Sequence, residues 1–296
     1  MHKFLIKSII LFGIFLGVNF LYLQVLKETD WSLSKVNRIM QFKNQDYDYI
    51  FLGASLTLDG IDAEYLTEKG IKAYNFGTQG TSIRSSYIQL EHYLKNNDNP
   101  EVVILGLGSL SKSYKDYKNE FEIALPYKHF YFENEWNFEN LPLVKFRGSA
   151  IENFKQIVSK NHREAEFVRG QLRIKKKVVD KTNYKDKLDS IIHISDYKGA
   201  SHLFKIDSIC KLRGIKFILM EMPGFKKTQN LIPVGPHKLS DEKHDTLTLY
   251  NLNNKELVSK IIDSKNDWLG NSHLNQYGAK KLTEYLYNNI LKHKNF

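Results

Sequence analysis

The chain has 296 residues, 42% of them hydrophobic and 13% aromatic, which suits a globular protein with a sizeable core and excludes a disordered one. A single cysteine, Cys210, excludes an internal disulfide and a cysteine-rich metal site. The net charge of +10 would suit anionic lipid or acidic glycan as a partner, and equally a lysine-rich surface that faces only water.

The amino terminus carries an apolar segment. Residues 8–26 contain no charged side chain, and the stretch approaches the roughly 20 residues that span a bilayer. Lys3 and Lys7 precede it, which favours a cytoplasmic amino terminus. Because its end offers no small residues for signal cleavage, we predict an uncleaved anchor over residues 1–27, with the rest outside the cytoplasm. A removed signal peptide and a buried core helix are the alternatives.

Strands and helices alternate along residues 28–296 after a polar, helical segment at 28–42. Alternation of this kind predicts parallel strand pairing with helices on both faces, which is a three-layer α/β/α sandwich of flavodoxin-like type. The predicted strands lie at 47–52, 71–76, 102–105 and 215–220, and the predicted helices at 62–70, 82–94, 200–212 and from 276 onwards.

The alternation breaks between residues 111 and 196, which we interpret as an insertion over the sheet, serving as a lid or a partner surface. Six aromatic residues crowd positions 127–138 without a clear period; they would stack on sugar rings or simply pack. Helical patterns follow at 151–158 and 165–179.

Two short motifs carry candidate chemistry. Residues 49–56, Tyr-Ile-Phe-Leu-Gly-Ala-Ser-Leu, predict a buried strand that runs into a Gly-x-Ser turn, and place Ser55 at the carboxyl edge of the sheet. Residues 272–279, Ser-His-Leu-Asn-Gln-Tyr-Gly-Ala, place His273 just before a helix. A serine is a poor nucleophile until a base takes its proton, so Ser55 and His273 form a candidate nucleophile and general base.

Together with Asn-Phe-Gly-Thr-Gln-Gly-Thr-Ser at 75–82, these motifs resemble the SGNH (GDSL-type) hydrolase family over residues 48–111 and 200–290. The resemblance implies that Ser55 is the nucleophile and His273 the base. It also implies an oxyanion hole formed by the backbone N–H groups of Ser55 and Gly80.

Two positions depart from the family pattern. The family has an aspartate three residues before the histidine, where this chain has Gly270. We predict that Asp267 takes the orienting role, with Asp263 as a weaker substitute. The family's third oxyanion donor is an asparagine, and at that position this chain has Ser109. Ser109 is a candidate donor, and the alternative is that it only ends a strand.

The anchor followed by these motifs resembles membrane-bound members of the family, namely alginate O-acetyltransferase accessory proteins and the D-alanyl transfer protein of teichoic-acid synthesis. The resemblance implies an extracytoplasmic serine esterase or O-acyltransferase acting on acylated envelope glycan or a small acyl ester, with a membrane O-acyltransferase as a partner. A catalytically weak scaffold that binds glycan or such a partner is the alternative, and a lipase is a third.

Other ligand classes lack a signal in the sequence. There is no phosphate-binding loop, and Gly77-x-x-Gly80 is too short for a dinucleotide fingerprint. No histidine pair lies at metal-ligand spacing with a third ligand. We therefore expect no cofactor, no metal and no nucleic-acid partner.

Overall fold

The computed structural model describes residues 2–29, 31–108, 141–145, 147–148, 150–159, 167–175, 200–224, 229–240, 246–269 and 273–292. The chain divides into two compact units, one of residues 1–40 with 121–165 and the other of residues 41–120 with 166–296. Ser109 and the aromatic segment at 127–138 lie outside the described residues.

The second unit is built on one six-stranded sheet of order β2-β1-β3-β6-β8-β7. Neighbours pair in parallel except for β7, which is antiparallel to β8, so the predicted mainly parallel sheet is confirmed. The strands are β1 (Tyr49–Gly53), β2 (Ala73–Asn75), β3 (Val102–Leu107), β6 (Lys216–Glu221), β7 (His237–Ser240) and β8 (Thr246–Asn251). The sequence prediction missed β7 and β8.

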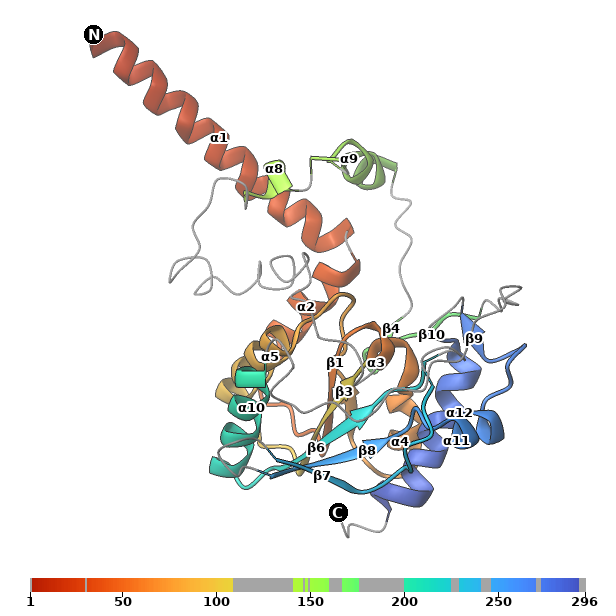
Figure 1. Cartoon of the computed structure of the whole chain (residues 1–296). Coiled ribbons are helices and arrows are strands. Elements are labelled where there is room, and N and C mark those ends of the chain that lie inside the picture. Colours follow the sequence, from red (N-terminus) through yellow and green to blue (C-terminus); the bar gives the residue numbers. More distant parts are fainter. Residues whose placement is uncertain are drawn as a thin grey trace. The chain divides into compact units, whose positions relative to one another are not determined.

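Helices cover both faces of this sheet, as Figure 1 shows. Because both faces are covered, the central strands β1 and β3 are buried at every position and read as continuous apolar runs. One face carries α5 (Ile83–Asn96) and α10 (Ala200–Leu212), and the other carries α3 (Ser55–Gly60), α4 (Ala63–Glu68), α11 (Lys255–Ile261) and α12 (Gln276–Leu286), which runs into a π-helical turn η4 (Tyr287–Leu291). The predicted three-layer α/β/α architecture is confirmed.

The helix predicted at 165–179 is wrong. Its first part is a hairpin of two short antiparallel strands, β4 (Phe167–Val168) and β5 (Gln171–Leu172). Arg169 and Gly170 have φ values of 47° and 80°, a left-handed turn that a helix does not allow. A Cβ on Gly170 would lie 2.1 Å from the backbone oxygen of Asn75, so the turn packs directly against the end of β2.

The first unit contains α1 (His2–Thr29), α2 (Trp31–Met40), α8 (Pro142–Lys145) and α9 (Ala150–Ser159). Helices α2 and α9 confirm the helical segments predicted at 28–42 and 151–158. Helix α1 is long and apolar enough to cross a membrane, a property that it shares with signal sequences. Helices α2, α8 and α9 all contact it.

Candidate active site

The turn between β1 and α3 depends on two glycines. Gly53 has a φ of +140°, and a Cβ there would lie 2.3 Å from Thr57 Oγ1 and 2.5 Å from the backbone oxygen of Gly106. A Cβ on Gly106, in the neighbouring strand β3, would lie 2.1 Å from the same hydroxyl. Thr57 Oγ1 donates to the Gly106 oxygen at 3.3 Å. The chain therefore turns sharply enough for Ser55, the first residue of α3, to follow β1 directly.

Asn75, at the end of β2, holds α3 in place. Its side chain is fully buried, and Nδ2 donates to the backbone oxygens of Thr57 at 2.7 Å, Leu58 at 3.3 Å and Ile61 at 3.0 Å. Its Oδ1 accepts from the Gly77 N–H at 2.8 Å. The asparagine thus supplies donors to three buried carbonyls at the carboxyl end of α3, one of which, that of Thr57, also accepts from the Ile61 N–H at 3.2 Å.

His273 comes from the other end of the chain. It lies in β10 (His273–Leu274), antiparallel to β9 (Trp268–Leu269), just before the amino terminus of α12. Asn275 caps that helix by accepting from the N–H groups of Tyr277 and Gly278 at 3.0 and 3.2 Å. A Cβ on Gly278 would lie 2.4 Å from the backbone oxygen of Asp267. The residues of the His-Leu-Asn-x-x-Gly pattern therefore fix the start of α12 and, with it, the position of the His273 imidazole.

Ser55, His273 and Asp59 form a continuous chain of contacts. Ser55 Oγ lies 3.1 Å from His273 Nε2, and His273 Nδ1 lies 3.3 Å from Asp59 Oδ2. The Asp59 side chain is 6% exposed and the His273 side chain 30% exposed. Ser55 and Asp59 are four residues apart on α3, so one turn of helix carries both.

Burial lowers the pKa of His273 from its ordinary value of 6.5. Burial therefore favours the neutral ring. A neutral ring satisfies both contacts if Nδ1–H donates to Asp59 and Nε2 accepts from the Ser55 hydroxyl, and we assign this tautomer from the hydrogen-bond pattern. That arrangement is the one that a general base needs before it takes a proton from serine.

Asp267 and Asp263 do not take the role predicted for them. Asp267 Oδ2 accepts from Lys281 Nζ at 2.6 Å and from the Asp263 N–H at 2.7 Å, so this carboxylate ties the loop before β9 to α12. The Asp263 carboxylate accepts from its own loop, including the Lys265 N–H at 2.7 Å. The carboxylate that faces the His273 ring belongs to Asp59.

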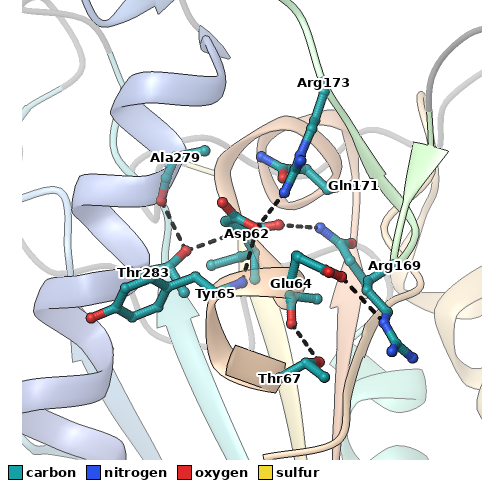
Figure 2. A network of polar contacts seen from close by, with 12 residues as sticks. Asp62, Glu64, Tyr65, Thr67, Arg169, Gln171, Arg173, Ala279 and Thr283 are labelled. Atoms are coloured by element: carbon teal, nitrogen blue, oxygen red, sulfur yellow. Dashed lines mark hydrogen bonds and ion pairs between the residues drawn. The ribbon is translucent and has the colours of Figure 1, made fainter. Parts of the chain in front are cut away.

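A polar network fixes the end of α3 and the start of α4, as Figure 2 shows. Gln171 Nε2, in the β4–β5 hairpin, donates to the backbone oxygen of Asp59 at 3.2 Å. Arg173 pairs with Asp62 at 3.3 Å, and the Asp62 N–H donates to Thr283 Oγ1 of α12 at 2.9 Å. The hairpin, α12 and the segment that carries Asp59 are thus held together.

Two of the three predicted oxyanion donors lie among the described residues. Ser55 is the first residue of α3, where a helix leaves its N–H groups without intrahelical partners. Gly80 lies in the turn after β2 with a φ of +68°. That turn is bound to the end of β1 by the Thr78 N–H, which donates to the Gly53 oxygen at 3.0 Å. Ser109 lies outside the described residues, and the donor roles of all three stay predictions.

Within the part of the chain that the structure describes, no group of three or more histidine, cysteine, aspartate or glutamate side chains is placed to hold a metal ion.

No protein-family model matches the chain, and no curated protein sequence matches it. A solved structure from Streptococcus pneumonia, provisionally described as that of a platelet activating factor, matches with a TM-score of 0.40 and 11% identity. The match covers 92% of this chain and 97% of that one. A likeness of this degree says nothing about activity.

Sequence reasoning missed Asp59, although a signal for it exists. Ser55-Leu56-Thr57-Leu58-Asp59 has the i, i+4 spacing that puts two side chains on one helix face. The sequence predicts a turn here and a helix only from residue 62, and an i, i+4 spacing brings side chains together only within a helix. A helix predicted to start at the serine itself would have found the carboxylate.

Proposed function

We propose that this protein is a serine esterase or O-acyltransferase of the SGNH type, with Ser55 as nucleophile, His273 as general base and Asp59 as the carboxylate that orients the base. The observation that carries the proposal is the pair of contacts at 3.1 and 3.3 Å that links the three side chains. The alternation of strands and helices and the motif order support the same reading.

The reaction follows from these contacts. His273 Nε2 takes the hydroxyl proton as Ser55 Oγ bonds to the acyl carbon, and Asp59 stabilises the imidazolium that forms. The carbonyl oxygen becomes an oxyanion, for which the N–H groups of Ser55 and Gly80 are the proposed donors. The ester C–O bond then breaks, and the leaving alcohol takes the proton from Nε2. The acyl group is now bound to Ser55.

The second half of the reaction decides whether the protein hydrolyses or transfers. Water or an acceptor hydroxyl gives its proton to His273 Nε2 and attacks the acyl carbon; the bond to Ser55 Oγ then breaks, and Oγ takes the proton back from Nε2. Water yields an acid, and a sugar hydroxyl yields a new ester. General-base assistance of this kind contributes about 10²–10⁴ in rate.

The proposed substrate is an acylated envelope polysaccharide. Support comes from the apolar helix α1, which would hold the catalytic unit at the outer face of the membrane, and from the net charge of +10, which suits an acidic polymer. The motif layout resembles that of proteins that act beside a membrane O-acyltransferase, and we propose such a partner here.

Labelling of the full-length chain in detergent with a fluorophosphonate probe tests the nucleophile. We expect the wild-type chain to label and Ser55→Ala to lose the label, because Oγ is the atom that attacks phosphorus. Ser259→Ala, which removes an exposed hydroxyl of α11 that donates to the Glu256 backbone oxygen, is the matched control and should label fully.

Release of acetate from an acetylated glycan and cleavage of a p-nitrophenyl ester then test the activity. His273→Ala should lower both nearly as far as Ser55→Ala, since base and nucleophile act as one unit. If the wild-type chain neither labels nor turns over, and Ser55→Ala still supports envelope function in cells, the enzyme reading fails. A scaffold that binds glycan or an acyltransferase would then take its place.

A further inference from the structure

Helix α9 carries three exposed apolar side chains. Ile151, Phe154 and Val158 are 73%, 45% and 84% exposed, and their spacing puts them on one side of the helix. Single exposed apolar side chains are ordinary, but three on one face of a ten-residue helix mark a contact surface.

The opposite side of α9 is attached to α1. Asn153 is buried, and its Nδ2 donates to the Tyr22 hydroxyl at 3.1 Å. Phe154 lies at the edge of the exposed face, where its ring also stacks on the Tyr22 ring with centroids 5.6 Å apart, which is why it is the least exposed of the three. Near the same level, Asn19 Oδ1 accepts from the Leu143 N–H of α8 at 3.0 Å. Helices α8 and α9 are thus fixed to one part of α1 (Figure 1).

The attachment point coincides with the end of the exposed apolar part of α1. Large exposed side chains run from Phe4 to Leu21, whereas Tyr22 and Leu26 are fully buried. At 1.5 Å per residue the exposed part is about 26 Å long, close to the roughly 30 Å of a bilayer's hydrocarbon core. If α1 spans the membrane, α9 is held where the hydrocarbon gives way to the polar headgroups.

The charges beside the apolar face fit that location. Lys155 is exposed on α9, one helical turn from Ile151, and Arg147 is exposed in the turn before the helix. Apolar side chains flanked by basic ones are the pattern of helices that lie in a membrane surface, where the cations meet lipid phosphates.

We infer that α9 lies in the outer surface of the bilayer, with Ile151, Phe154 and Val158 in the acyl-chain boundary and Lys155 and Arg147 among the headgroups. The inference rests on α1 remaining in the membrane. Helix α9, which is part of the insertion at 111–196, would then make a second contact with the membrane beside α1.

The test uses single cysteines in the full-length chain, reconstituted in phosphatidylcholine and phosphatidylglycerol vesicles on a Cys210→Ala background. An environment-sensitive fluorophore is attached at Ile151→Cys or at Val158→Cys. Phe12→Cys, in the apolar part of α1, reports whether α1 is in the bilayer. Leu212→Cys, an 87% exposed leucine at the end of α10, is the matched control for an apolar side chain in water.

Two quenchers locate each fluorophore: iodide in the water, and a spin label on the lipid chain near the headgroup. We expect the lipid label to quench the fluorophores on α9 and iodide to quench them about fivefold less than the one at Leu212. Adding Val158→Asp should return the fluorophore at Ile151 towards water, because the charge pulls that face out of the lipid.

Other patterns overturn the inference in distinguishable ways. Strong iodide quenching on α9 would show that the face is in water. Protection from both quenchers would show that protein covers it, either the rest of the chain or a second copy. If the Phe12 fluorophore is quenched by iodide, the anchor itself fails, whatever α9 does, while the chemistry of Ser55 is tested separately by labelling.

Discussion

The role of Asp59 makes the sharpest prediction. Asp59→Asn keeps the shape of the side chain and removes its charge, so the contact at 3.3 Å with His273 Nδ1 loses its anionic partner. A hydrogen bond to a charged group contributes about 1.5–3 kcal/mol, which corresponds to roughly 10- to 150-fold in kcat. An asparagine that turns its NH₂ towards the ring also favours the tautomer with the proton on Nε2, which cannot accept the serine proton. In the triad of a serine protease, the comparable Asp to Asn change lowers kcat about 10⁴-fold. We therefore expect kcat to fall by about 10²–10⁴.

The pH profile separates an electrostatic role from a structural one. An anion beside the ring favours imidazolium, so Asp59→Asn should lower the pKa of His273 further and move the acid limb of kcat/KM to lower pH. The matched control is Asp267→Asn, which changes the carboxylate that pairs with Lys281. It should leave the acid limb in place, because the contacts of this carboxylate are with Lys281 and the Asp263 N–H and not with the His273 ring.

Ester hydrolysis by purified full-length variants across the pH range provides the measurement, with circular dichroism to confirm that each variant is folded. Wild-type kcat in folded Asp59→Asn, or a greater loss in Asp267→Asn than in Asp59→Asn, would refute the assignment.

Three further predictions follow from the same site. In wild type, burial lowers the pKa of His273 from 6.5, so a pH–rate profile should show activity retained at pH 6.5. Activity should fall at lower pH, where the ring becomes protonated and can no longer act as a base. Asn75→Ala should lower the free energy of unfolding by about 2–4 kcal/mol, measured by denaturant titration, since it removes three hydrogen bonds to buried carbonyls at the end of α3; a loss under 0.5 kcal/mol would contradict the anchoring role. Gly53→Ala should abolish activity because its Cβ would clash with Thr57 Oγ1, whereas Gly70→Ala, at a φ of +86° with open space around it, should cost only strain and keep activity; equal effects on kcat would argue against the clash.

The sequence predicted what depends on local pattern. Apolar runs bounded by turns predicted β1, β3 and β6, because strands buried on both faces are continuously hydrophobic. Ser55 and His273 could be predicted because each lies in a motif whose residues shape the local backbone. Gly53 allows the turn before Ser55, and Asn275 with Gly278 starts the helix after His273. Their contact at 3.1 Å joins the turn after β1 to β10, which lies outside the main sheet, so it depends on the tertiary fold.

The parts that were missed depend on contacts between distant segments. Gln171 and Arg173 lie in a basic, helix-like stretch, and their bonds to Asp59 and Asp62 add to the Arg169-Gly170 turn in holding a hairpin there. Asp267 has the side chain and the sequence position that the orienting role needs, but its carboxylate pairs with Lys281 of α12. The pairing of Asp267 with Lys281 depends on the tertiary fold and leaves no local pattern in the sequence.

The placement of Ser55 and Asp59 on one short helix has a consequence for when activity arises during synthesis. The proposed nucleophile and its carboxylate emerge from the ribosome together, whereas the proposed base follows 218 residues after the serine in a chain of 296. Under the proposed mechanism, a growing chain therefore carries an unactivated serine for most of translation. A chain that terminates before His273 would lack the base and would be inert.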